Sequence, residues 1–227
     1  MQKSYYEAYD ERYKTVHQKG IHWFSENSSP IVLDVLSRYP IGKQAALLEI
    51  GCGEGRDALP LLKEGRKLLA TDISEEAIRY CRELLPDYRD CFRVLDCVNG
   101  SLPQRFDFIY AVAVIHMLVL DEDRNAFYRF IRRHLSPGGI ALICSMGDGK
   151  TERESDIQTA FTLQQRSCRG ETLAVAATSC RMVSEKTFEK ELAENGLDIL
   201  EKGLTGIPEE FPEMMYAVVK KGGPSAG

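Results

Sequence analysis

The chain has 227 residues, enough for one domain of ordinary size, and 44% of them are hydrophobic, which suffices for a buried core. Its 29 Lys and Arg are outnumbered by 34 Asp and Glu, so the net charge is −5. Because nucleic acids are bound through clustered cations and no basic run stands out, this balance argues against nucleic acid as a general partner. The seven cysteines are scattered and odd in number, which is typical of reduced cytosolic thiols rather than of disulfides or a zinc site.

No stretch reaches the roughly 20 apolar residues that a membrane-spanning helix needs. The longest apolar run covers residues 108–115 and continues past His116 to Leu120. The N-terminal stretch "MQKSYYEAYDERYK" is charged and tyrosine-rich, without the apolar centre of a signal peptide. We therefore expect a cytoplasmic protein with no membrane partner.

Short apolar runs alternate with helical patterns over much of the chain. In "SSPIVLDVLSRY", a serine cap and Pro30 at the first helical position predict a helix that leads into the core. Strands that alternate with helices in this way predict a mostly parallel sheet covered on both faces. Buried strands are predicted at 45–50, 67–72, 91–96, 106–114 and 139–146, and helices at 56–63, 74–85 and 121–134, the last ended by "SPGG".

The remainder of the chain does not continue this alternation of strands and helices. Residues 147–183 contain the polar stretch "GDGKTERESD" and the Thr-, Val- and Ala-rich stretch "ETLAVAATSCRMV", and we predict an insertion over the carboxyl edge of the sheet. One more helix is expected to end at Asn195-Gly196, followed by two strands, the last in "PEMMYAVVKK". Residues 222–227 are expected to be a flexible tail.

The first predicted strand ends in the glycine-rich stretch "EIGCGEG", residues 49–55. In open parallel sheets, ligands bind outside the carboxyl ends of the strands, where the strand order reverses. Glycine permits a positive φ there and a close approach of the backbone to a ligand. The dinucleotide fingerprint needs glycines at its first, third and sixth positions, but counting from Gly51 the sixth residue is Arg56 and the third glycine is the fifth residue, Gly55. This spacing weakens a nicotinamide or flavin site without excluding it.

The next two strand ends carry carboxylates. Asp72 stands where a carboxylate can accept hydrogen bonds from both hydroxyls of a ribose. Asp96 could accept from the exocyclic amino group of adenine, and the backbone N–H of Cys97 could donate to the ring. Three consecutive strand ends therefore offer groups for one nucleoside, with no obvious partner for a phosphate.

Five stretches in order, over about residues 45–146, resemble the class I S-adenosylmethionine-dependent methyltransferases: "LLEIGCGEGRDAL", "LLATDISEEAI", "VLDCVN", "RFDFIYAVAVIHML" and "FIRRHLSPGGIALI". The first two are similar to the small-molecule branch that includes tellurite-resistance and thiopurine-type methyltransferases. The resemblance implies an α/β, Rossmann-like fold in which seven mostly parallel strands end in an antiparallel strand, with helices on both faces. One methyltransferase domain would span 1–221, with an N-terminal helical cap at 1–44 and the insertion, 147–183, over the active site.

The resemblance also implies S-adenosylmethionine as cofactor and S-adenosylhomocysteine as product. Glu49 and the backbone of Gly51 and Gly53 would face the methionine part. Asp72 would hold the ribose, and the Asp96–Cys97 pair would flank the adenine. The backbone that ends the fourth strand would lie near the cofactor's amino group. The other members of the expected cofactor site are Cys52, Gly55, Ile73, Ala111 and Val112.

Because the sulfonium already activates the methyl group, the protein mainly has to align a small-molecule acceptor for direct displacement and exclude water. Positioning of this kind can supply roughly 7–11 kcal/mol without a dedicated base. His116 is the candidate general base, and the alternative is a packing role in the apolar stretch "VIHML". The N-terminal tyrosines would form a lid or pack an aromatic stripe on the core. The expected acceptor-binding residues are Tyr13, Trp23, Arg56, Met146 and Asp148.

Other interpretations stay open. Arginines of the insertion could bind an anionic acceptor, and three cysteines could bind a metalloid, although free cysteine is more often a small buried hydrophobe and no metal site is expected. A non-catalytic binder of the cofactor is one alternative function, and a nucleotide-dependent oxidoreductase is a less favoured one. The fourth strand lacks the Asn/Asp-Pro-Pro-aromatic turn of methylases that modify amide or base nitrogens, which argues against DNA methylation. The chain could form a homodimer. The arginines are Arg166, Arg169 and Arg181, and the cysteines are Cys144, Cys168 and Cys180.

Overall fold

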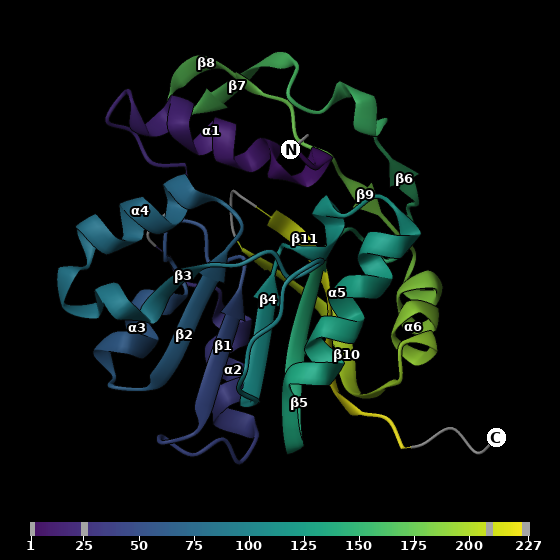
Figure 1. Cartoon of the computed structure of the whole chain (residues 1–227). Helices are drawn as coiled ribbons and strands as arrows, with labels where there is room; N and C mark the ends of the chain where they lie inside the picture. Colours follow the sequence, from purple (N-terminus) through teal and green to yellow (C-terminus); the bar gives the residue numbers. More distant parts are fainter. Residues whose placement is uncertain (1–2, 24–26, 208–210, 224–227) are drawn as a thin grey trace.

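A seven-stranded sheet forms the centre of the computed structural model, which describes residues 3–23, 27–207 and 211–223 (Figure 1). Its strands are β1 (Ala46–Ile50), β2 (Lys67–Asp72), β3 (Phe92–Val94), β4 (Phe106–Val112), β5 (Leu135–Met146), β10 (Leu197–Ile207) and β11 (Phe211–Lys221). They lie in the order β10-β11-β5-β4-β1-β2-β3. The pairs from β3 to β5 are parallel, and β11 is antiparallel to both of its neighbours. The predicted Rossmann-like, mostly parallel sheet with an antiparallel last strand is confirmed.

Helices cover both faces of the sheet because its central strands are apolar on both sides. One face packs against α2 (Pro30–Arg38), α3 (Ala58–Lys63) and α4 (Glu75–Leu84). The other face packs against α5 (Asp121–His134) and α6 (Glu185–Glu194). Serine side chains begin two of these helices: Ser74 Oγ accepts from Ala77 N at 3.0 Å, and Ser184 Oγ accepts from Thr187 N at 3.3 Å.

Several predicted boundaries differ from the observed ones, and two of the differences have a visible cause in the backbone. β4 ends at Val112 rather than at residue 114, because Ala113 has a φ of 58° and turns the chain out of the strand. β5 begins at Leu135, directly after α5, and includes the stretch "SPGG" as an irregularity. The register shifts there, since Phe106 pairs with Leu135 but Phe108 pairs with Ile140. The helix stop was therefore predicted in the right place, while the strand takes up the residues that follow it.

The N-terminal segment lies across the carboxyl ends of the central strands (Figure 1). It contains the short helix η1 (Tyr5–Glu7) and α1 (Ala8–His17). The insertion contains the ribbon of β6 (Arg153–Glu154) and β9 (Arg181–Met182) and the hairpin of β7 (Leu163–Cys168) and β8 (Glu171–Ala176). The remaining short helices are η2 (Pro86–Cys91), η3 (Ile115–Met117) and η4 (Ile157–Thr159).

The β7–β8 hairpin packs on α1. Val16 of α1 shares a buried cluster with Cys168, Leu173 and Val175 of the hairpin. The turn between the strands has positive φ at Arg169 and Gly170, which suits a tight hairpin. The sequence analysis predicted an insertion without a hairpin, because the strand-like residues of β7 are mostly polar and exposed.

Along the described residues, no helix has both the length and the apolar character to cross a bilayer. Of the predicted tail, residues 224–227 lie outside the described part of the chain.

The ends of β1 and β4 approach each other closely at Gly51. Gly51 has a φ of 73°, and a Cβ built on it would overlap Cγ2 of Val114, which follows β4. The glycine is therefore required by a neighbouring side chain as well as by its own backbone conformation. This contact fixes the glycine-rich loop against the segment that leaves β4.

Gly51→Ala is expected to lower the free energy of unfolding by about 3 kcal/mol, the sum of a strained left-handed backbone and an overpacked contact with Val114. Gly42→Ala is the matched control, because a Cβ at Gly42 meets no heavy atom within 4 Å and its φ is not positive. Urea-induced unfolding of both variants measures the difference. Equal stability of the two variants would contradict the proposed tight contact.

Candidate functional site

A cavity opens at the carboxyl ends of the central strands, beneath α1. It encloses about 950 Å³ of empty space, including its open mouth. Its walls come from the loops after β1, β2, β3 and β4, from η1 and α1, and from the start of β11. The predicted site residues that line it are Glu49, Gly51, Cys52, Asp72, Ile73, Asp96, Cys97 and Val112 of the cofactor set, with Tyr13 and Arg56 of the acceptor set.

Asp72 joins the two loops next to the centre of the cavity. Its Oδ2 accepts from Gly53 N and its Oδ1 accepts from Ser74 N, each at 2.8 Å. Burial raises the pKa of Asp72, although both backbone donors favour the ionised form. The carboxylate therefore holds the glycine-rich loop at a fixed position relative to the start of α4.

A second group of carboxylates lies at the end of β1. Glu49 is buried, and Tyr110 donates to its Oε2 at 3.0 Å. Burial and the neighbouring Asp57 raise the pKa of Glu49 well above its usual range. Asp57 in turn accepts from the backbone N–H and hydroxyl of Ser29, and Arg56 Nη2 lies 3.2 Å from its Oδ2. The loop that begins α2 is thereby bonded to the floor of the cavity.

Asp96 lies at the other end of the cavity, after β3. Its Oδ1 accepts from Val98 N at 2.8 Å, and its Oδ2 accepts from Asn99 Nδ2 at 2.9 Å. The hydroxyl of Tyr6, from η1, also lies 3.3 Å from Asp96 Oδ2. The N-terminal segment therefore reaches the group that the sequence analysis assigned to adenine.

Polar contacts bind α1 to α4 and to the glycine-rich loop. Asp10 Oδ1 accepts from Ser74 Oγ at 2.8 Å and from Glu76 N at 3.1 Å. His17 lies between two carboxylates, with Nε2 at 2.8 Å from Glu54 and Nδ1 at 2.8 Å from Glu76. Burial by itself lowers the pKa of His17. The two carboxylates raise the pKa by more than burial lowers it, so the net shift is upward.

Beyond β4, residues 115–120 form an irregular segment whose backbone groups are bonded by distant side chains. We call it the 115–120 loop; it contributes Met117 and Leu118 to the cavity. Arg124 Nη1 donates to the carbonyls of Ile115 and Leu118 at 3.0 and 3.1 Å. The 115–120 loop does not pair with a neighbouring strand. Hydrogen bonds from side chains therefore satisfy its buried backbone groups.

Three further side chains complete this bonding. Ser179 Oγ donates to the Met117 carbonyl at 2.7 Å, and Arg181 Nη1 donates to the Val119 carbonyl at 2.6 Å. The hydroxyl of Tyr5 accepts from the backbone N–H groups of Val119 and Leu120 at 2.9 and 3.2 Å. The loop is thus fixed from η1, α5 and the insertion at once.

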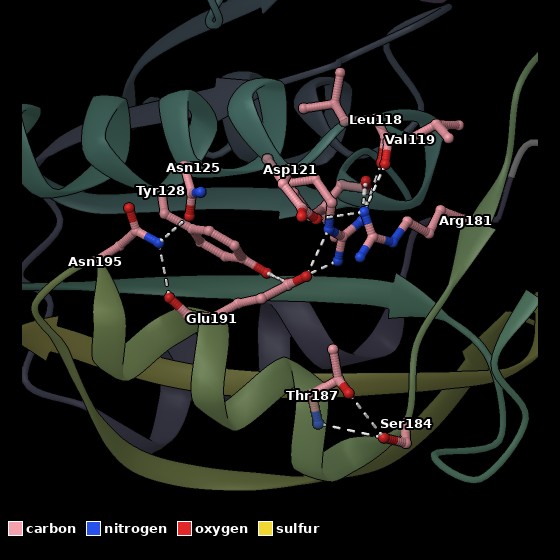
Figure 2. Close-up of polar contacts among 12 residues, drawn as sticks. Leu118, Val119, Asp121, Asn125, Tyr128, Arg181, Ser184, Thr187, Glu191 and Asn195 are labelled. Atoms are coloured by element: carbon pink, nitrogen blue, oxygen red, sulfur yellow. Dashed lines mark hydrogen bonds and ion pairs between the residues drawn. The ribbon is translucent and has the colours of Figure 1, made fainter. Parts of the chain in front are cut away.

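Glu191 of α6 supports this arrangement from outside (Figure 2). Its two carboxylate oxygens accept from Arg124 Nε at 2.8 Å and Nη2 at 2.7 Å, and Tyr128 donates to it at 2.8 Å. The Arg124 side chain is only 1% exposed, so its charge depends on this one carboxylate among the described residues. The bidentate pair orients the guanidinium toward the loop carbonyls.

His116 is buried within the 115–120 loop and does not line the cavity. Its ring packs edge-on against Phe211 with the centroids 5.7 Å apart, and within the described part of the chain its Nδ1 has no hydrogen-bond partner. Burial, with a smaller contribution from Arg124, lowers the pKa of His116 to about 3. The imidazole is therefore uncharged at neutral pH, and its role as a base stays a prediction.

Six other predicted site residues lie outside the cavity walls: Gly53, Gly55, Ala111, Trp23, Met146 and Asp148. Trp23 packs at the α1–hairpin cluster, and its backbone N–H donates to Glu54 at 2.8 Å. Met146 pairs with Met214 in the sheet. The Asp148 carboxylate accepts from the backbone of Lys150 and Thr151. A strand end alone therefore did not decide which side chains face the cavity.

The residues of the alternative interpretations also lie elsewhere. Arg169 donates to the His22 carbonyl, Arg181 holds the Val119 carbonyl, and Arg166 is exposed on β7. Among the residues that the structure describes, none of the three cysteines lines the cavity, and no three His, Cys, Asp or Glu side chains are grouped to hold a metal ion.

Sequence reasoning did not assign several residues that line the cavity. Tyr6 and Tyr9 were considered only as members of a lid or stripe, and Asp57 was not singled out. Met117 carried a weak signal because it follows a strand end, whereas Phe211 carried none, since it is the pairing of β11 with β5 that brings it to the site.

Comparison with known proteins agrees with this fold. Residues 48–141 match the family model described as "Methyltransferase domain". Trans-aconitate 2-methyltransferase of Azoarcus sp. (strain BH72) is 28% identical over 122 residues, which are 53% of this chain and 46% of that protein. The matches thus span about half or less of the curated relatives' own length.

Two solved structures are similar over nearly the whole chain. Burkholderia thailandensis 1,6-didemethyltoxoflavin-N1-methyltransferase, with bound 1,6-didemethyltoxoflavin and S-adenosylhomocysteine, has a TM-score of 0.71 at 17% identity and covers 98% of this chain and 92% of its own. An S-adenosylmethionine-dependent methyltransferase from Clostridium acetobutylicum has a TM-score of 0.63 at 18% identity, covering 93% and 96%. The chain therefore has the same fold as these methyltransferases, and part of it, residues 48–141, matches a methyltransferase family model.

His17→Gln is expected to reduce stability in a pH-dependent way. A histidine whose pKa is raised by folding stabilises the fold fully below its unfolded pKa of about 6.5, and this contribution disappears as pH rises through the folded value. The difference in unfolding free energy between the original chain and His17→Gln should therefore be largest near pH 6 and smaller near pH 9. Urea unfolding at several pH values measures it. A difference that stays constant or grows with pH would argue against the bridge to Glu54 and Glu76.

Glu191→Gln is expected to lower the unfolding free energy by about 3 kcal/mol, because it leaves the buried charge of Arg124 without its carboxylate. Glu194→Gln removes the same charge from the same helix, where the side chain is 60% exposed, and should change stability by less than about 0.5 kcal/mol. Chemical denaturation of both variants provides the comparison. Similar losses of unfolding free energy in the two variants would mean that the ion pair between Arg124 and Glu191 does not stabilise the fold more than an exposed charge does.

Proposed function

We propose that this chain is an S-adenosylmethionine-dependent methyltransferase that moves a methyl group to a small-molecule acceptor by direct displacement, with S-adenosylhomocysteine as product. The observation that carries the proposal is that three successive strand ends, with Glu49, Asp72 and Asp96, border one cavity. These three residues lie within residues 48–141, the part of the chain that matches a methyltransferase family model.

The chemistry of the cavity suits a nucleoside cofactor without phosphates. Asp72 would accept from the ribose hydroxyls through the lone pairs that Gly53 and Ser74 leave free. Asp96 and the N–H of Cys97 would bind the adenine. Glu49, Gly51, Cys52 and Arg56 surround the remaining part of the cavity floor, where the methionine part would lie.

When bound, S-adenosylmethionine supplies a methyl group that its sulfonium has already activated. The residues of this chain then have to orient the acceptor and exclude water, which is the task of preorganised walls rather than of a strong base. The described lining includes apolar and aromatic groups from α1, the 115–120 loop and β11, and these fit that task. His116 would serve as a base only for an acceptor whose acidic proton comes within reach of its uncharged ring.

Finer assignments rest on the sequence alone. They are the tellurite-resistance and thiopurine-like branch, the cytoplasmic location, the homodimer, the absence of a nucleic-acid partner, and the division into cap, domain and insertion. The proposed function requires none of them.

Asp72→Asn is expected to weaken the binding of S-adenosylhomocysteine about 10- to 100-fold, since hydrogen bonds to a charged acceptor contribute most of the ribose contact. Asp34→Asn, on the exposed side of α2, is the matched control and should bind as the original chain does. Calorimetry measures the affinity, with NAD as a comparison ligand. Unchanged binding in Asp72→Asn would show that the ribose assignment is wrong, and binding of NAD instead would favour the oxidoreductase alternative.

Methyl-labelled cofactor separates an enzyme from a binder. Transfer of the label into a metabolite extract supports the enzyme, whereas binding of S-adenosylhomocysteine without transfer to any metabolite favours the non-catalytic binder.

A further inference from the structure

The charges of the cavity are collected at one end. The carboxylates of its lining come from the ends of β1 and β2 and from the segments that follow β1 and β3; they are Glu49, Asp57, Asp72 and Asp96. Arg56 is the sole cation among the described lining residues, and it lies 3.2 Å from Asp57 in the same group. These are the groups that the proposed function assigns to the cofactor.

The wall beyond β4 has no charged side chain of its own among the described lining residues. The sheet order puts β4, β5 and β11 on the far side of β1 from Asp72 and Asp96. There the cavity is lined by Val114 and Met117 after β4 and by Phe211 at the start of β11. None of these three side chains carries a charge or a strong hydrogen-bonding group.

Tyr9 of α1 also lines the cavity. The guanidinium of Arg12 lies behind it, 4.8 Å from the ring centroid, and donates to the Ala176 carbonyl and to Thr178 Oγ1. Next along the chain, Ser179 donates to the carbonyl of Met117. Tyr9 and Met117 are thus linked through one short segment of the insertion.

The arginines that bond the 115–120 loop do not line the cavity. Arg124 donates to carbonyls of the 115–120 loop and pairs with Glu191. Arg181 donates to the Val119 carbonyl and pairs with Asp121 (Figure 2). Neither they nor Arg12 is among the lining residues. The cations close to the wall therefore fix its backbone instead of facing an acceptor.

We propose that the acceptor is an uncharged molecule with a flat, apolar body, which binds between Tyr9, Met117 and Phe211. An acceptor carboxylate or phosphate at this wall would be desolvated, and the only cation it would find in the described lining is Arg56, which already lies 3.2 Å from Asp57. Aromatic and thioether side chains instead favour a flat apolar surface. The inference rests on the proposed methyl transfer and narrows its substrate class, so that polycarboxylates are excluded as acceptors.

Fractionation by charge tests the substrate class. A metabolite extract is divided at neutral pH into fractions held by an anion exchanger, held by a cation exchanger, and held by neither, and each is incubated with the full chain and methyl-labelled cofactor. We expect the label in the fraction held by neither exchanger. Label in an ion-exchanged fraction would overturn the inference and leave methyl transfer intact. Label in no fraction would contradict the proposed function itself.

Met117→Lys tests the wall. A lysine there places a charge at the apolar surface and should lower kcat/KM for the labelled acceptor by about tenfold or more. The affinity for S-adenosylhomocysteine should stay within about twofold, which also reports that the variant is folded. Met117→Leu, which keeps an apolar chain, is expected to lose less than Met117→Lys.

Leu163→Lys adds the same charge on β7, where the leucine is 77% exposed and lies outside the cavity lining, and should transfer as the original chain does. Equal rates for Met117→Lys and Leu163→Lys would overturn the assignment of the wall.

Discussion

The close contact between Gly51 and Val114 is the constraint on which the site depends. It stands between β1 and β4, where the strand order reverses and a parallel sheet leaves room for a ligand. Ala113, with its left-handed backbone, turns the chain so that Val114 meets the glycine-rich loop. Such strain persists only where the surrounding structure holds it. The contact therefore sets the distance between the glycine-rich loop and the segment that leaves β4.

Hydrogen bonds and ion pairs between residues far apart in the chain fix the 115–120 loop and α1, which are not strands of the sheet. The 115–120 loop has no ladder partners, and Tyr5, Arg124, Ser179 and Arg181 satisfy its backbone groups. Asp10 and His17 bind α1 to α4 in the same manner. A wall fixed before a ligand arrives loses little entropy on binding, and for methyl transfer, alignment of the acceptor is most of what the protein has to supply.

Three carboxylates of the site, Glu49, Asp72 and Asp96, were predictable because they lie at strand ends, whereas Asp57, at the start of α3, was not. Asp72 and Asp96 close short apolar runs, and in parallel strands such ends meet at one edge, so their common cavity could be foreseen. Met146 and Asp148 also stand at a strand end, but they do not line the cavity. At the end of β5 the neighbouring strand is antiparallel, and Met146 is engaged with Met214 instead of the cavity. Trp23 was assigned to the acceptor but is taken up by the cluster between α1 and the hairpin.

The sequence by itself determined the alternation of strands and helices, the mostly parallel sheet and the charged end of the cavity, because these follow from local periodicity and from residues next to strand ends. Only the tertiary structure decided the apolar end. Tyr9, Met117 and Phe211 come from α1, η3 and β11, and they meet through packing between segments far apart in the chain. The local sequence pattern does not predict which distant residues line the same cavity. That depends on the order in which the strands pair and on where α1 lies across the folded sheet.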